Sequence, residues 1–297
     1  MRGRKPSTRP GRRACGPPTR TISASFCAPI SEAHEMHPNA MRPNPMRTGL
    51  ARGELQIGTW VTMARNPAIL TLLQAAGLDF ARIDMEHSAA SMETIADFAA
   101  LSRALDFPIA VRPPKANREW ITRLLDVGVW NIHCPQVENA AHARDIVAAS
   151  RYAPRGLRGN GGHSAATGFD TTVNANERRT FANEQVHITV MFETAAAFND
   201  LDQIAAMDGI DALTVGPADL AQDLGVFGTP DMASALDAKR DLIIAAAQKH
   251  GKISAMLVNS KAQAEQWKAA GALLLVYLSD VEVMLQGFKN AMTQIKG

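Results

Sequence analysis

Acidic and basic side chains follow several short apolar runs of this chain, at the points where those runs end. The residues that share this placement are Asp84, Glu86, His87, Arg112, Glu193 and Asp219. When parallel strands close into a barrel, their carboxyl ends meet at one face, and side chains from different strands converge there. These residues are therefore candidates for one catalytic site, provided that the apolar runs are strands of such a barrel.

Two of the acids are candidates for binding a metal ion. Glu193 and Asp219 stand at matching positions after two successive runs, so their carboxylates could converge on one divalent cation. Mg²⁺ and Mn²⁺ prefer such oxygen ligands and leave coordination positions for water or substrate, and Co²⁺ is a further candidate. A 2-oxo acid such as pyruvate would fill two of those positions through its carboxylate and keto oxygens. The cation would then stabilise the negative charge that develops on the keto oxygen as the neighbouring carbon becomes an enolate.

The remaining residues suit the other steps of the same chemistry. Arg112 would place a permanent positive charge beside the keto oxygen. Because histidine exchanges protons near neutral pH, His87 is predicted to move the proton of an aldol hydroxyl, with Asp84 fixing its tautomer. No lysine stands at the end of these runs, which disfavours a mechanism through a Schiff base.

Each residue also has a structural interpretation when it is taken alone. A carboxylate after a strand is more often a helix cap than a ligand, so Asp219 could cap a helix and Glu193 could lie in a first helical turn. Arg112 could form a structural ion pair, and His87 could be an ordinary surface histidine. The placement of all of them at strand ends favours a shared site.

The elements that would position these residues alternate along the chain from about residue 55. The expected strands are 56–62, 80–84, 108–112, 131–135, 187–193, 212–216, 253–257 and 273–278. The expected helices are 66–76, 91–105, 117–126, 139–149, 194–205, 232–250, 261–270 and 281–295. This alternation predicts an α/β fold, a (β/α)8 or TIM barrel over residues 53–297. His133 and His187 fall within strands and are expected to be buried.

Two segments depart from the alternation. Residues 1–52 are rich in Arg, Pro and Ser and show no helical or strand period, so they are expected to be a disordered tail. Removal of residues 1–45 is accordingly expected to leave turnover intact. Residues 150–185 are too long and too glycine-rich for a simple connection, and His163 within them is predicted to bind the substrate.

Composition argues against several other classes of protein. Residues 1–50 carry nine Lys and Arg against two Glu, whereas the rest of the chain has 22 basic and 27 acidic residues. This mildly acidic body argues against nucleic-acid binding. Three cysteines cannot build a disulfide framework, and no apolar run is long enough to cross a membrane. A reducing, cytoplasmic location is therefore expected.

Six segments of the sequence resemble the HpcH/HpaI aldolase/citrate lyase family of class II 2-oxo acid aldolases, and the resemblance runs over about residues 56–290. The segments are Ile83-Asp84-Met85-Glu86-His87, Val111-Arg112-Pro113-Pro114, Leu124-Leu125-Asp126-Val127-Gly128, Arg151-Tyr152-Ala153-Pro154-Arg155-Gly156-Leu157-Arg158-Gly159, Phe192-Glu193-Thr194 and Val215-Gly216-Pro217-Ala218-Asp219-Leu220. The resemblance implies that Glu193 and Asp219 bind the metal. It also implies that His87 and Asp84 form a catalytic dyad and that Arg112 stabilises the enolate.

The resemblance carries further implications for binding and assembly. Gly216, Pro217 and Ala218 are expected to contact the substrate. Asp126 matches an acid that such enzymes contribute to the active site of a neighbouring subunit. A homo-oligomer is therefore expected, a trimer or hexamer in which the last helix packs on a partner barrel.

The sequence departs from the family pattern at two places near the expected substrate. Met191 stands where the family often has Gln, and residues 160–166 replace the usual Gly-Ser-Ala pattern. The identity of the aldehyde partner is therefore left open. The expected reaction is reversible cleavage of a 4-hydroxy-2-oxo acid into pyruvate, or a related 2-oxo acid, and an aldehyde. The alternatives are a lyase of the same fold that uses the enolate for decarboxylation or acyl-CoA cleavage, and a catalytically silent oligomeric scaffold.

Overall fold

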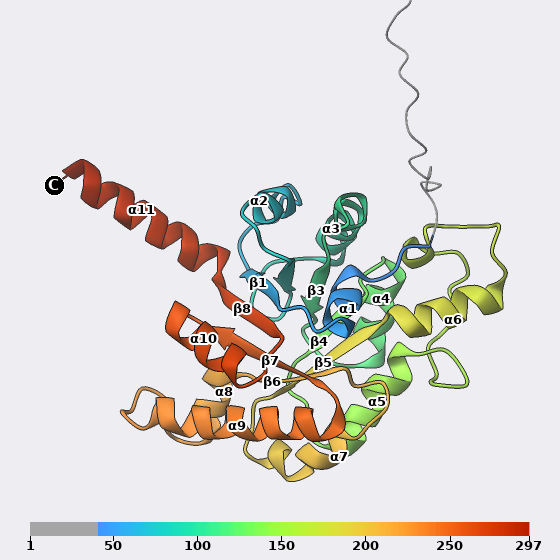
Figure 1. Cartoon of the computed structure of the whole chain (residues 1–297). Coiled ribbons are helices and arrows are strands. Elements are labelled where there is room, and N and C mark those ends of the chain that lie inside the picture. Colours follow the sequence, from blue (N-terminus) through green and yellow to red (C-terminus); the bar gives the residue numbers. More distant parts are fainter. Residues whose placement is uncertain (1–40, 297) are drawn as a thin grey trace, which may run out of the picture. The chain divides into compact units, whose positions relative to one another are not determined.

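Eight parallel strands form a closed barrel in the computed structural model of the chain, which describes residues 41–296 (Figure 1). Each strand pairs with its neighbours in sequence, and the last strand pairs with the first. The strands are β1 (Gln56–Val61), β2 (Phe80–Asp84), β3 (Ile109–Arg112), β4 (Asn131–Cys134), β5 (His187–Phe192), β6 (Ala212–Val215), β7 (Ile253–Val258) and β8 (Leu274–Ser279). All eight predicted strands are present, and the predicted (β/α)8 barrel is confirmed.

Helices connect the strands and surround the barrel. They are α1 (Pro45–Ala51), α2 (Ile69–Ala75), α3 (Met92–Leu105), α4 (Arg118–Asp126), α5 (Ala140–Ser150), α6 (Ala175–Gln185), α7 (Leu201–Ala205), α8 (Pro217–Asp223), α9 (Met232–His250), α10 (Lys261–Ala269) and α11 (Asp280–Lys296), with the 3₁₀ helices η1 (Ala165–Thr167) and η2 (Ala196–Asp200). The helix predicted over 194–205 is divided between η2 and α7. Helices α1 and α6 were not predicted from the sequence, and α8 was considered there only as the helix that Asp219 could cap.

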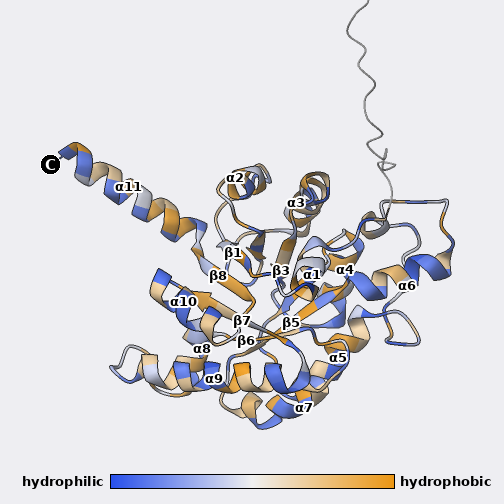
Figure 2. Cartoon of the chain, viewed as in Figure 1, coloured by the Kyte–Doolittle hydropathy of each residue, from blue (hydrophilic) through white to orange (hydrophobic). Residues whose placement is uncertain are grey.

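Strand β5 shows how the sequence fills the core. All six of its residues are buried. Its alternate residues Ile188, Val190 and Phe192 belong to the cluster between the barrel and its helices, whereas Met191 belongs to the cluster inside the barrel. This two-residue period is that of a strand covered on both faces. Figure 2 shows the same concentration of apolar residues on several strands. His187, at the start of the strand, is buried, as predicted.

Helix α1 closes the end of the barrel at which the strands begin. Met46 and Leu50 lie one helical turn apart and pack into the interior cluster with Phe80, Ala110 and Leu274. We call these five residues the floor of the barrel.

A buried polar contact holds the floor helix in place. The side chain of Asn44 accepts a hydrogen bond from the Arg47 backbone N–H and so caps the helix. Its Nδ2 donates to Asn131 Oδ1 at 2.6 Å and to the Gln185 carbonyl at 2.9 Å. The segment before α1 is therefore tied to β4 and to the end of α6.

The prediction that residues 1–52 form a disordered tail is therefore wrong for residues 45–51. The physical reason is tertiary contact: Met46 and Leu50, in an otherwise polar segment, pack into the apolar cluster at the base of the barrel. Asn44 is fully buried, so removal of residues 1–45 would take away this buried contact. That turnover survives such a removal stays a prediction. Residues 1–40 lie outside the described residues.

Helix α11 differs from the other long helices in how little of it is buried against its own barrel. Asp280 at its first position is its one buried residue among those described. The carboxylate of Asp280 accepts hydrogen bonds from the backbone N–H groups of Thr62, Met63 and Ala64, which fixes the start of the helix. Beyond that point α11 extends away from the barrel (Figure 1). No helix within residues 41–296 is long and apolar enough to cross a membrane.

Candidate active site

The charged residues that follow the strands gather at the end of the barrel opposite the floor. Asp84 ends β2, Arg112 ends β3, Glu193 follows β5, and Asp219 lies in the first turn of α8 after β6. Glu86 follows Asp84 by two residues. We call these five residues the mouth of the barrel. The carboxyl ends of barrel strands are where barrel enzymes place their catalytic groups.

Arg112 is the fixed cation of the mouth. Its Nε and Nη2 donate to the two carboxylate oxygens of Asp84 at 2.9 and 2.8 Å, a bidentate pair. Its Nη1 lies 3.2 Å from Glu86 Oε2, and its guanidinium lies 4.5 Å from the centre of the Trp60 ring. Burial opposes the charge of Arg112, but Asp84, Glu86 and Glu193 outweigh it and raise its pKa. The guanidinium is thus held in one orientation with its charge secured.

Glu193 is a buried carboxylate with a perturbed pKa. Burial raises its pKa to about 7, and the negative charges of Glu86 and Asp219 act in the same direction. The Gln136 backbone N–H donates to its Oε2 at 2.5 Å and partly offsets the effect. A Cβ on Gly216 would lie 2.4 Å from Glu193 Cγ, so only glycine leaves room for this side chain. Gly216 therefore provides the space for the Glu193 carboxylate, whose burial is energetically unfavourable.

This electrostatic arrangement fits a divalent cation. Glu86, Glu193 and Asp219 are close enough that each of the other two raises the pKa of Glu193, and burial raises the pKa of Glu86 as well. A bound dication would relieve that repulsion and keep the carboxylates ionised. No group of three or more His, Cys, Asp or Glu within residues 41–296 is arranged to hold a metal by itself. A site on Glu193 and Asp219 would therefore leave its other positions to water or substrate.

His87 lies at the rim of the mouth, with a partner other than the predicted one. Its side chain is 61% exposed, and its Nε2 lies 3.7 Å from Glu86 Oε2. Asp84, which was predicted to fix the tautomer of His87, instead pairs with Arg112 and accepts the backbone N–H of Glu86. Glu86 thus connects Arg112 with His87. The sequence gives Glu86 no separate role, although its place directly after a strand end, between Asp84 and His87, is a usable signal.

The predicted substrate-binding residues of the β6 to α8 connection lie at the mouth. Gly216 donates its backbone N–H to the Phe192 carbonyl at 3.0 Å, and Pro217 begins α8. Proline is favoured at this first helical position because its missing N–H has no helical partner there. Ala218 and Asp219 are exposed in the first turn of α8.

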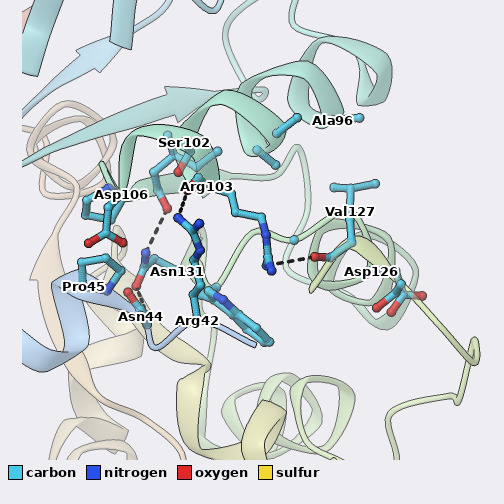
Figure 3. A pocket seen from close by; sticks show the side chains of 18 of the residues that line it. Arg42, Asn44, Pro45, Ala96, Ser102, Arg103, Asp106, Asp126, Val127 and Asn131 are labelled. Carbon is cyan, nitrogen blue, oxygen red and sulfur yellow. Dashed lines mark hydrogen bonds between the residues drawn. The ribbon is translucent and has the colours of Figure 1, made fainter. Parts of the chain in front are cut away.

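Two predicted residues lie at the other end of the barrel. Asp126 and His163 line a cavity of about 460 Å³ together with Ile109 and Asn131, which begin β3 and β4. Figure 3 shows Asp126 and Asn131 at this cavity. Asp126 accepts a hydrogen bond from Arg158 Nη2 at 2.7 Å. The structure therefore does not bring His163 to the mouth of its own chain, because the segment that carries it follows a helix rather than a strand.

Fold and site together define a barrel enzyme, with buried acids and an oriented arginine facing a mouth where a small molecule can bind. The sequence matches the family model described as HpcH/HpaI aldolase/citrate lyase over residues 56–286. The chain belongs to this family, which confirms the resemblance inferred from its motifs.

Individual relatives agree with this assignment. The chain is 33% identical to a 5-keto-4-deoxy-D-glucarate aldolase from Klebsiella pneumoniae, over 82% of this chain and 94% of the relative. It is 33% identical to a hydroxypyruvate/pyruvate aldolase from Agrobacterium fabrum, over 86% of this chain and 94% of the relative. The structure of an HpcH/HpaI aldolase from Desulfitobacterium hafniense aligns with a TM-score of 0.79 at 28% identity, over 84% of this chain and 96% of that one. Aldolases are carbon–carbon lyases, and this chain is an enzyme of that class.

Proposed function

We propose that this enzyme is a metal-dependent aldolase that reversibly cleaves a 4-hydroxy-2-oxo acid into pyruvate, or a related 2-oxo acid, and an aldehyde. The observation that carries the proposal is the buried Glu193, whose pKa is raised by burial and by neighbouring acids, beside the oriented Arg112. A carboxylate so placed is stabilised by a cation. The names of the relatives as aldolases support the same reaction class.

Glu193 and Asp219 would hold the ion, either Mg²⁺ or Mn²⁺ by the preference of hard cations for oxygen ligands. When bound, the cation supplies a Lewis acid for the keto oxygen of the substrate. Arg112 would donate its remaining N–H groups to the same oxygen, and its contacts with Asp84 and Glu86 hold the guanidinium in place. Catalysis by preorganised charges of this kind requires that they do not reorient during the reaction.

His87 is assigned the proton transfers. In the cleavage direction it accepts the proton of the C4 hydroxyl, directly or through water, and Glu86 stabilises the imidazolium that forms. The C3–C4 bond breaks, its electron pair passes to C3 to give the enolate of pyruvate, and the oxygen of C4 becomes that of the aldehyde. Protonation of C3 then yields the methyl group. The same steps in reverse form the bond.

We also propose that the enzyme is a homo-oligomer. Helix α11 exposes apolar side chains at a repeating spacing of four and three residues, which places them on one side of the helix. They are Val281, Leu285, Phe288, Met292 and Ile295. A soluble chain rarely leaves such a stripe in water. Together with the family resemblance, in which Asp126 serves a neighbouring subunit, it favours packing of α11 on a second copy.

Exchange of the pyruvate methyl protons in deuterated water tests the proposed chemistry without any aldehyde. The wild-type enzyme with Mn²⁺ is expected to catalyse exchange, and removal of the metal with a chelator to abolish it. Asp219→Ala should also abolish exchange, whereas Asp241→Ala, at an exposed acid on α9, should not. Exchange that persists without metal, or in Asp219→Ala, would refute the metal assignment.

The same assay separates the alternatives. A catalytically silent scaffold would show no exchange under any condition. A decarboxylase or an acyl-CoA lyase of this fold would exchange pyruvate slowly or not at all, and would consume oxaloacetate or an acyl-CoA faster than it condenses pyruvate with any aldehyde.

A further inference from the structure

A second cavity adjoins the mouth on the side of β7 and β8. It has a volume of about 500 Å³ and is lined by residues at the carboxyl ends of these strands, including Leu257, Asn259 and Leu278. The carboxyl end of every barrel strand faces the same way, so this cavity opens on the same end as the catalytic residues. We call it the side cavity.

Two residues connect the side cavity with the mouth. Trp60 lines the cavity, and its ring also lies 4.5 Å from the guanidinium carbon of Arg112. Pro217 lines the cavity as well and stands two residues before Asp219 on α8. A substrate held between Arg112 and Asp219 would therefore have the side cavity next to it.

The charges of the side cavity are unfavourable to an anion. The charged residues among its described lining are Asp237, Arg240 and Glu282. Arg240 is buried and its Nη1 lies 2.7 Å from Asp237 Oδ1, so this cation is already neutralised. Glu282 accepts a hydrogen bond from the Ser279 hydroxyl at 2.8 Å and adds a negative charge that no lining cation offsets.

The uncharged polar side chains of the side cavity can form hydrogen bonds with hydroxyl groups of a ligand. Asn259 and Gln263 lie on the rim, where the Gln263 Oε1 accepts the backbone N–H of Asn259 at 3.1 Å. The Gln263 amide N–H groups can donate in the cavity, and the Asn259 side chain can donate through its N–H groups or accept through its oxygen. Apolar walls from Leu257, Val276 and Trp60 complete it. This combination of walls and amides is typical of pockets for small polar molecules.

We propose that the side cavity binds the aldehyde half of the substrate and selects an uncharged, hydroxylated short-chain aldehyde over one that carries a carboxylate. The inference rests on the proposed aldolase function and specifies its acceptor. A carboxylate in the cavity would meet Glu282, and the one guanidinium of the lining, Arg240, is already paired with Asp237. Hydroxyl groups would meet the amides of Asn259 and Gln263. Repulsion between like charges at close range in such a site corresponds to about a tenfold effect on binding.

The test compares aldehydes of matched length in condensation with pyruvate and Mn²⁺. Glycolaldehyde is expected to give a kcat/KM at least about tenfold above that of glyoxylate. Glu282→Gln should raise kcat/KM for glyoxylate by about threefold to tenfold and change the value for glycolaldehyde less. Glu265→Gln, at an exposed acid of α10 outside the cavity, is the matched control and should leave both values unchanged.

The outcomes separate this inference from the function on which it rests. If pyruvate exchanges its methyl protons but glyoxylate is the better acceptor, or Glu282→Gln leaves the ratio between the two aldehydes unchanged, the inference is overturned and the aldolase function stands. If exchange itself is absent in the presence of metal, both fail. A second variant, Asp237→Asn, frees Arg240 and should also improve glyoxylate; no gain there would count against the charge argument.

Discussion

The side chains buried at the two ends of the barrel have opposite effects on the stability of the folded state. The mouth buries Asp84, Glu193 and most of Arg112, groups whose removal from water is unfavourable unless each is paired. The floor buries Met46 and Phe80, whose removal from water stabilises the fold. The catalytic groups thus lie where burial destabilises the folded state, and burial of apolar side chains at the opposite end stabilises it. Substitutions at the two ends should therefore affect different quantities.

The largest effect is expected at the mouth, on activity alone. Glu193→Gln keeps the size of the side chain and removes the charge, so kcat/KM should fall by about a thousandfold, equivalent to the several kcal/mol that a metal contributes to such a step. The free energy of unfolding should not fall, because an amide is less costly to bury than a carboxylate. Urea unfolding and pyruvate exchange measured on one preparation check both statements. If Glu193→Gln lowered the free energy of unfolding by more than about 1 kcal/mol, the claim that the mouth affects activity alone would be wrong.

The next effect is expected at the floor, on stability alone. Met46→Ala should lower the free energy of unfolding by about 2–4 kcal/mol, because it opens a cavity under the barrel. Turnover per folded molecule should stay within about twofold of wild type, since the floor contacts none of the catalytic groups. Met63→Ala is a matched control, because the Met63 side chain is 58% exposed. An equal destabilisation by both variants would show that Met46 does not seal the barrel.

A smaller effect is expected from the buried histidine at the start of β5. Burial lowers the pKa of His187 to about 4 from the usual 6.5, with Arg47 and Arg151 acting in the same direction and Asp211 opposing. Between these values the unfolded chain binds a proton that the folded chain does not, so stability falls as the pH drops from 6.5 towards 4. The loss can reach about 3 kcal/mol.

Urea unfolding of wild type and His187→Gln at pH 7 and pH 5 measures this contribution. The difference between the two pH values should shrink in the variant, which has no titrating group at this position. Identical pH dependence in the two proteins would show that His187 does not contribute to acid sensitivity.

The smallest effect is expected from the cap of the floor helix. Asn44→Ala removes the cap and leaves the Asn131 side-chain oxygen without its donor, for a loss of about 1–2 kcal/mol. Asn44→Asp keeps the acceptor for the helix but loses the donor to Asn131, so its behaviour divides the effect between the two contacts. No measurable change in either variant would place the floor helix outside the cooperative unit of the barrel.

Much of the fold could be predicted because each strand carries its own signal. Runs of β-branched and aliphatic residues between helical stretches mark β1 to β8, and the strand ends then place Arg112, Glu193 and Asp219 at one end of the barrel. Helix α1 could not be found this way, because only two of its side chains supply apolar contact and its partners come from distant strands. Helix α6 is polar on nearly all sides and buries only Ala182 and Asn183, so it has no hydrophobic period to recognise.

The candidate site was predictable in its residues but not in all their pairings. Which acid pairs with Arg112 depends on side-chain directions at the end of β2, where Asp84 and Glu86 compete, and sequence spacing does not decide between them. His163 lies away from the mouth of its own chain for a general reason, and its contact with substrate stays a prediction. A segment that follows a helix returns to the end where the next strand begins, so it lies at the floor end rather than at the mouth.

Helix α11 has a consequence for how the enzyme behaves when diluted. A helix of 17 residues held to its own chain mainly at Asp280 is marginal in water, since isolated helices of this length gain little from their hydrogen bonds alone. If α11 packs on a second copy, as we propose, its helical content should depend on protein concentration while that of the barrel does not. Hydrogen exchange of the backbone amides of residues 284–296 should slow as the protein concentration rises. The order of this segment would then report the fraction of enzyme that is assembled.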